Sequence, residues 1–201
     1  FAAAAPAIMN MAEDQDDPEI LHDLLTSLAR LQTREALPLF RANLRHPDQY
    51  LAALCLEAVG KFNDPESMEV FQDHILENEQ DEKYESCGVT TWKAVDGLAA
   101  LGTDQALAFL ASKIHHRNPT ARRLIHEALT RAGQKAVTPV AARLSQESED
   151  QRIMAANVLG RMGLKTGADQ LVLAMDQGLM NTPNLRFAAL EALGNIPCLK
   201  S

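Results

Sequence analysis

A pattern of apolar residues with helical spacing recurs six times along this chain of 201 residues. Each copy is anchored on one leucine or valine, and successive anchors lie 31, 39, 31, 30 and 34 residues apart. The anchors are Leu28, Val59, Leu98, Leu129, Leu159 and Leu193. One short unit cannot bury its apolar face alone, so recurrence at this period predicts units that stack on their neighbours.

Each unit has the pattern of two helices joined by a turn. In the first helix apolar residues fall at i, i+3, i+4 and i+7, as at Leu51, Leu54, Cys55 and Ala58. The first helices are predicted to end at residues that tolerate a left-handed backbone, namely Asn63, Gly102, Gly133 and Gly163. The predicted second helices share a small residue, an aliphatic residue and two further apolar positions. These sets are Ala36/Leu37/Phe40/Leu44, Ser67/Met68/Phe71/Ile75, Ala106/Leu107/Leu110/Ile114, Ala136/Val137/Val140/Leu144 and Gly167/Ala168/Leu171/Met175.

Helix starts are marked by a capping residue followed by proline. The pairs are Asp17-Pro18, Asp64-Pro65, Asn118-Pro119 and Thr182-Pro183. Proline is tolerated at the first helical position because that position has no intrahelical partner for an N–H group. For the same reason Pro38 and Pro139 are expected in or near the first turn of second helices.

Three short runs around the turns carry a family resemblance. They are Glu57–Glu66, Ala100–Gly102 and Asn157–Gly163. The repeat resembles the HEAT/armadillo family of α-solenoids, and the short PBS-lyase-type HEAT-like repeat is the closer likeness. The resemblance covers residues 18–196 and implies an all-α, right-handed α-solenoid of about five and a half helix-turn-helix repeats. We expect residues 1–15 to be an N-terminal tail or the remnant of an upstream element, and residues 16–201 to form one continuous solenoid.

Charge is divided unevenly along the chain, whose net charge is −8. Residues 1–100 carry a net charge of −12 and residues 101–201 a net charge of +4. This balance excludes a globally basic nucleic-acid binder, and the gradient favours a partner held in one orientation. Three cysteines without CxxC spacing argue against a disulfide framework or a zinc site. No apolar stretch has the length of a membrane span, and we expect a cytoplasmic protein.

Two families of enzymes are built from similar repeats. The resemblance to deoxyhypusine hydroxylase implies several His-Glu pairs around iron, but this chain has one such pair, His126-Glu127, and too few ligands for that site. Phycobilin lyases share the repeat, and no chromophore-site motif is evident here. We therefore predict no catalytic, cofactor or metal residues and a protein that is not an enzyme, with a HEAT-repeat lyase or metal hydroxylase as the alternative.

The predicted partner-binding residues come from three places. Second helices line the concave face of such solenoids, and their residues outside the core register are Glu35, Glu69, Asp73, His74, Phe109, Lys113, Arg143 and Gln170. All of these except Glu35 and Gln170 are predicted partner-binding residues. Phe109 is either packed between repeats or exposed in the groove. The acidic insertion at 77–89 adds Tyr84, and Trp92 follows it. Trp92 is either a binding residue or buried at the start of a helix.

The third place is the basic stretch 113–123, which includes His115, His116, Arg122 and Arg123. It is interpreted as solvated loop charge, as a patch for an acidic protein, or as a nucleic-acid contact. The leading hypothesis is a non-catalytic scaffold that binds an unidentified protein along the concave face. Nucleic acid binding through residues 113–123 is a further alternative, although the chain lacks interleaved aromatic residues for base stacking.

Overall fold

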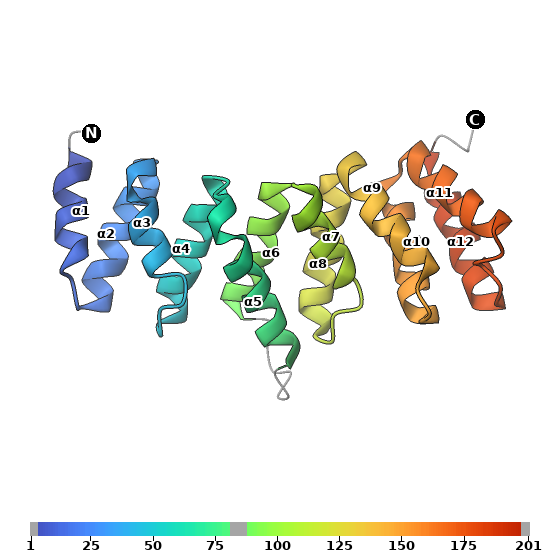
Figure 1. The fold of residues 1–201 in the computed structure, drawn as a ribbon, viewed down its shortest axis with the longest axis horizontal. Helices are drawn as coiled ribbons and strands as arrows, with labels where there is room; N and C mark the ends of the chain where they lie inside the picture. Colours follow the sequence, from blue (N-terminus) through green and yellow to red (C-terminus); the bar gives the residue numbers. More distant parts are fainter. Residues whose placement is uncertain (1–3, 81–87, 198–201) are drawn as a thin grey trace. The chain divides into compact units, whose positions relative to one another are not determined.

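The computed structural model describes residues 4–80 and 88–197, which form α-helices and short 3₁₀ turns with no strand among them (Figure 1). The all-α prediction is confirmed. The chain divides into two compact units, Phe1–Leu101 and Gly102–Ser201, and each unit is a stack of helix pairs as expected for an α-solenoid. Right-handedness and continuity of the array across Leu101 stay predictions.

Unit 1 begins with a helix, α1 (Ala5–Glu13), inside the segment 1–15 that sequence assigned to a tail or an upstream remnant. α1 contacts α2 and α3, and its Ala5 and Ala12 are buried. The other elements of unit 1 are α2 (Pro18–Arg30), η2 (Arg34–Ala36), α3 (Leu37–Ala42), α4 (Gln49–Lys61), η3 (Pro65–Ser67), α5 (Met68–Gln80) and α6 (Val89–Leu101).

Unit 2 continues the alternation of first and second helices. Its elements are α7 (Asp104–Ser112), α8 (Pro119–Ala132), α9 (Gln134–Ala141), η4 (Ala142–Ser145), α10 (Glu149–Met162), α11 (Lys165–Asp176) and α12 (Pro183–Asn195). Pro139 lies inside α9 rather than near its start, so that expectation is wrong. The helix continues past Pro139 to Ala141 and is followed by the 3₁₀ turn η4.

Local signals place these helices where the sequence predicts them. The side chains of Asp17 and Asn118 accept hydrogen bonds from the first backbone N–H groups of α2 and α8. Asn63 and Gly163 have positive φ angles of 51° and 66° at helix ends. The helix-turn-helix units therefore form from local signals, and packing between units then buries their apolar faces.

The core follows the predicted register. Of the six anchors, Leu28, Val59, Leu98, Leu129 and Leu159 are fully buried. Most of the predicted second-helix residues are buried as well, among them Phe40 and Phe71. First helices approach closely where side chains are small: a Cβ on Gly60 would lie 3.1 Å from the Cα of Gly97. In unit 2 a Cβ on Gly160 would lie 2.7 Å from the Cα of Ala192.

Candidate functional site

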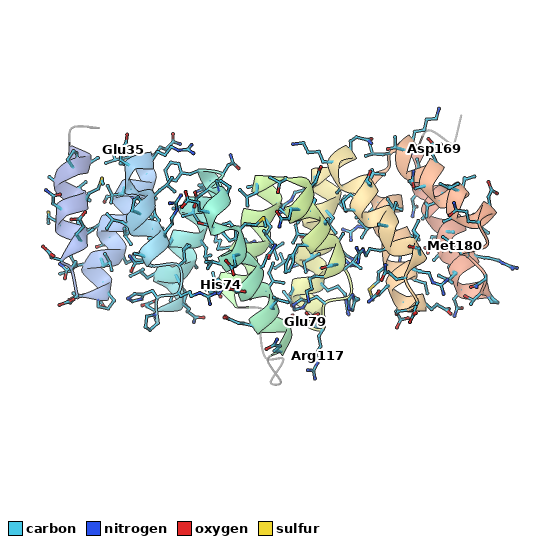
Figure 2. All side chains as sticks on the ribbon, viewed as in Figure 1. Glu35, His74, Glu79, Arg117, Asp169 and Met180 are labelled. Carbon is cyan, nitrogen blue, oxygen red and sulfur yellow. The ribbon has the colours of Figure 1, made fainter. Side chains whose placement is uncertain are left out.

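Three of the predicted partner-binding residues, Glu69, Asp73 and His74, lie on one helix, α5 of unit 1. Figure 2 labels His74 on this helix. Glu69 is exposed. The side chain of His74 is only 11% exposed, and its Nε2 lies 3.0 Å from the carbonyl oxygen of Leu44. His74 therefore holds the end of the preceding second helix in place, and Glu69 is the most accessible of the three.

Two acidic residues of α5 pair with one arginine, Arg45, in the turn that follows α3. The guanidinium of Arg45 contacts the carboxylate of Asp73, and its Nη1 donates to Glu77 at 3.0 Å. The side chains of Arg45 and Glu77 are largely exposed and that of Asp73 partly so, and solvent-screened pairs of this kind contribute little to stability. Their effect is to occupy Asp73, which leaves Glu69 as the free carboxylate among the predicted residues of α5.

A buried carboxylate, Asp64, lies under this row of ion pairs. Its side chain is 2% exposed and accepts two hydrogen bonds from Arg41, at 2.9 and 2.5 Å, and one from Ser67 at 2.5 Å. Burial opposes the ionisation of Asp64, but the hydrogen bonds from Arg41 and Ser67 outweigh it and hold the pKa of this carboxyl below its usual value. A further acid, Glu66, lies 2.6 Å from Arg41. Arg41 and Asp64 therefore join two successive repeats.

Trp92 lies on α6, a first helix, and so does not share the second-helix face of α5. Its side chain is 46% exposed, and the Nζ atom of Lys93 lies 4.6 Å from the ring centroid. Exposure of this size contradicts the buried interpretation of Trp92, and its role in binding stays a prediction. Tyr50, on the neighbouring first helix α4, is 66% exposed. The predicted residue Tyr84 lies outside the described residues.

The predicted residues of unit 2 are dispersed over α7, α8 and η4. Phe109 and Arg143 are half-buried, and the Nε atom of Arg143 is buried without a hydrogen-bond partner among the described residues. Lys113 caps the C-terminal end of α7 through its backbone N–H. On the second-helix side, α9, η4 and α11 enclose a hollow of about 290 Å³ lined by Leu144, Gln170 and Leu173 among others.

The basic stretch 113–123 is only partly a surface feature. His116 is fully buried, and its Nδ1 accepts a hydrogen bond from the backbone N–H of Asn118 at 3.1 Å. The interpretation of His116 as a solvated basic residue is therefore wrong, because its imidazole shapes the loop before α8. Arg122 donates to the carbonyl of His116 at 3.4 Å, and exposed Arg123 pairs with Glu127.

His126, the first member of the His-Glu pair, is half-buried on α8. Its Nε2 lies 2.7 Å from the carbonyl oxygen of Ile114. Desolvation by burial lowers the pKa of His126, although its hydrogen bond with Ile114 acts in the opposite direction. Within the described residues no group of three or more His, Cys, Asp or Glu side chains could hold a metal ion.

One hollow of unit 1 was not predicted, because it lies between first helices. It measures about 660 Å³ and is enclosed by α2, the turn that follows it, and α4. Arg30 and Lys61 on its rim occupy the same position of successive repeats, two residues after their anchors Leu28 and Val59. That recurrence is the sequence signal that could have indicated the site. We call this feature the α2–α4 hollow.

A smaller hollow of about 200 Å³ lies between α4 and α6, next to the close approach of Gly60 and Gly97. Glu57 lines both hollows of unit 1. Its carboxylate lies 2.5 Å from the Nζ atoms of both Lys61 and Lys93. Hydrogen bonds from these two lysines lower the pKa of Glu57, so the carboxylate stays ionised and fully engaged.

Comparison with known proteins supports the repeat assignment. Residues 5–88 match a family model described as HEAT repeats. A search of curated proteins finds no match to the chain. None of the helices in residues 4–80 and 88–197 combines the length and apolar composition that crossing a bilayer requires.

Three solved structures are similar to the chain. The complex of CpcE and CpcF of phycocyanin lyase from Nostoc sp. is 16% identical, with 99% of this chain and 83% of that chain covered, at a TM-score of 0.54. This likeness concerns the fold alone. Human deoxyhypusine hydroxylase in complex with glycerol is 18% identical over 98% of this chain and 74% of that chain, at a TM-score of 0.43. A designed armadillo repeat protein is 14% identical over 96% of this chain and 99% of that chain, at a TM-score of 0.49.

Proposed function

Because residues 5–88 carry HEAT repeats, we propose that this protein is a non-catalytic scaffold that binds a protein partner through the faces of its stacked helices. The repeat match is the observation that carries the proposal. An array of small helix pairs offers an extended surface on which many side chains contribute to one interface. HEAT-type folds also host enzymes, so the proposal has to rest on what the side chains do.

The charges of unit 1 support a partner with basic residues. Glu66, Glu69, Asp73 and Glu77 follow one another at spacings of three, four and four residues, which places them on one face of η3 and α5. Arg41 and Arg45 neutralise only part of this charge. A partner with lysine or arginine side chains complements what remains, and complementary charge favours orientation and rapid association.

Exposed aromatic residues support an interface on the first-helix side as well. Trp92 and Tyr50 belong to the first turns of the neighbouring helices α6 and α4, and both are largely exposed. Tryptophan and tyrosine are enriched among residues that dominate binding energy. The partner in this proposal therefore contacts unit 1 through both an aromatic and a charged element.

Affinity capture with the intact chain as bait tests the proposal. The informative variant combines Glu69→Lys with Trp92→Ala, because both side chains are exposed and neither holds the core. Glu191→Lys is the matched control, an exposed carboxylate of α12 in unit 2. Partners captured by the unchanged chain and by the control, and lost by the double variant, support the proposal. Identical partners for all three baits overturn the choice of surface.

The alternatives give different results. An enzyme of the metal hydroxylase type requires stoichiometric iron in protein purified without chelator, and finding it would overturn the scaffold proposal. A phycobilin lyase would bind a bilin chromophore and transfer it to a protein. Nucleic acid binding through residues 113–123 requires a salt-dependent shift of DNA or RNA that disappears when Arg122 and Arg123 are replaced by alanine. No shift at low salt removes that alternative.

A further inference from the structure

The α2–α4 hollow has the size and chemistry of a small-molecule site. Its volume of about 660 Å³ falls within the range of roughly 300–1,000 Å³ that is common for ligand pockets. The two helices that enclose it are neighbours within unit 1 (Figure 1). The hollow therefore does not depend on the relative placement of the two units.

One part of the lining is apolar. Ala29 of α2 faces the hollow together with Leu54, Ala58 and Phe62 from α4 and its end. The ring of Phe62 is tilted against that of Phe40, with the two centroids 6.2 Å apart. This contact fixes the position of the Phe62 ring. The hollow thus offers a firm apolar surface on which a flat ligand can rest.

The rim is cationic. Arg30, Arg34 and Lys61 line the hollow, and the carboxylate of Glu57 is the acidic group among its lining residues. Glu57 is already engaged by Lys61 and Lys93. Neither Arg30 nor Arg34 forms an ion pair with a described residue, and both are exposed. Two guanidinium groups are thus available to a ligand, and guanidinium groups bind carboxylate and phosphate oxygens with paired hydrogen bonds.

One local feature of the lining lacks an explanation in the packing of the helices. The hydroxyl oxygen of Thr26 is buried without a hydrogen-bond partner among the described residues, which is costly for a polar atom. Gln32, also in the lining, has a positive φ because it ends α2 as Asn63 ends α4. Buried polar atoms without a partner are rare, so the hydroxyl group of Thr26 calls for an explanation.

We propose that the α2–α4 hollow binds a small organic anion. The ligand has a flat apolar body that rests on Leu54 and Phe62, and a carboxylate or phosphate group that Arg30 and Arg34 hold at the rim. Thr26 supplies a hydroxyl group to a polar atom of the ligand. This site is independent of the partner-binding role proposed above, since it uses neither Glu69 nor Trp92.

The test is calorimetric titration of the full chain with three probes that share one ring system. 1-Naphthyl phosphate and 1-naphthoate carry the anionic group, and 1-naphthol is neutral. We expect saturable one-to-one binding of the two anions and binding of 1-naphthol that is weaker by about tenfold or more. The anion that binds more tightly shows whether the site prefers a phosphate or a carboxylate group. Inorganic phosphate alone is expected to bind too weakly to measure, because it leaves the apolar lining exposed.

Variants assign the binding to the hollow. Arg30→Gln combined with Arg34→Gln should weaken binding of the better anion at least about tenfold. Ala29→Leu should weaken all three probes, because the larger side chain fills the apolar part of the hollow. The matched control, Lys135→Gln with Lys165→Gln, removes two exposed cations of unit 2 and should leave the affinity unchanged. Circular dichroism verifies that each variant is folded.

The proposal fails if no probe binds saturably up to about millimolar concentration, which corresponds to about 4 kcal/mol of binding free energy. It also fails if the arginine variant and the lysine control lose equal affinity, because the interaction would then reflect general charge. Affinity capture with the arginine variant as bait tests the scaffold function separately. If this variant still captures the same protein partners, the scaffold function does not depend on the ligand site.

Discussion

The two units connect their repeats by different combinations of polar contact. In unit 1 charged side chains pair with each other, as Arg41 does with Asp64, beside the contact of His74 with the carbonyl of Leu44. In unit 2 side chains bond to backbone carbonyl groups at helix ends, as His126 does with Ile114. Arg152 likewise donates to the carbonyl of Leu179 at 2.7 Å. The first kind of contact needs two ionised groups, whereas a carbonyl accepts a hydrogen bond at any pH.

This difference follows from the charge composition of each unit. The boundary between the units, after Leu101, coincides with the change from a net charge of −12 to one of +4. Acids outnumber cations in unit 1, and Arg41 and Arg45 both pair with carboxylates of the next repeat. Cations are in excess in unit 2, and some of them bond to carbonyl groups instead. The charge gradient along the sequence therefore affects which polar contacts form inside each unit, besides its effect on a partner.

The units also differ in how their first helices cross. In unit 1 the buried ring of Phe71 fills the notch at Gly97, where an added Cβ would lie 2.5 Å from ring atoms. In unit 2 the helices meet backbone to backbone at Gly160 and Ala192. Of these two crossings, only the one in unit 1 therefore includes an aromatic ring, that of Phe71.

The largest effect is expected from Phe71→Ala in unit 1. The side chain is fully buried, so its removal leaves a cavity next to the Gly97 notch and should lower the free energy of unfolding by about 4 kcal/mol. Urea denaturation followed by circular dichroism measures this loss, and fluorescence of Trp92, in the same unit, reports it locally. A loss below about 1 kcal/mol would mean that the α4–α6 crossing closes over the cavity.

The second largest effect is expected from Asp64→Ala, which removes the buried partner of Arg41. The loss should be about 2–3 kcal/mol, because the hydrogen bonds from Arg41 and Ser67 disappear together. The control is Thr103→Ala, at the corresponding position of the next repeat, where the side chain only caps α7. That change should cost about 1 kcal/mol. Equal losses in urea denaturation would contradict a special role of the ion pair.

Periodicity and caps were sufficient to predict the helix pairs. The stripes that contain Leu28 and Phe40 follow a helical period, and caps such as Asp17 act within a few residues, so both are readable from the sequence. The burial of His116 was missed because it depends on a loop that folds back on the imidazole. No period in the sequence encodes that contact.

The candidate site was predicted less well than the fold. The exposure of Trp92 and of Glu69 was compatible with the hypotheses, but His74 proved to be mostly buried against Leu44. The α2–α4 hollow was missed because a hollow is the volume that side chains of two repeats leave unfilled. Such a volume depends on the separation of α2 and α4, and apolar spacing within one helix does not reveal it.

A third prediction uses pH to separate the units. Hydrogen bonds with backbone N–H groups lower the pKa of Asp48, and the pKa values of Glu57 and Asp64 are lowered too, all in unit 1. Desolvation lowers the pKa of His126 in unit 2. A lowered pKa means that the unfolded chain binds more protons, so stability falls as the pH falls. For His126 the loss starts near the unfolded value of about 6.5, and for the carboxyls it starts near about 4.

Hydrogen exchange with a short labelling pulse at fixed pH measures this difference. After equilibration at about pH 5.5, α8 should exchange severalfold faster than at neutral pH while α4 stays protected; α4 should lose protection only below about pH 4. His126→Gln should remove the early step in α8. Simultaneous loss of protection in both helices would show that the units do not differ in their response to acid.

The smallest effect is expected from Phe187→Ser in unit 2. Phe187 is 69% exposed on α12, whose buried residues Leu185, Ala188 and Ala192 lie on the other side of the helix. The substitution should change the free energy of unfolding by no more than about 0.5 kcal/mol, because it creates no cavity.

Leu190, 59% exposed on the same helix, extends this apolar surface, so the variant should also associate with itself less at high concentration in sedimentation velocity. Phe71 and Phe187 have the same side chain, and the gap of about 3–4 kcal/mol between their substitutions reflects mainly the difference in burial. A loss above about 1 kcal/mol at Phe187 would indicate that α12 is covered in solution, by a second copy or by another segment of the chain.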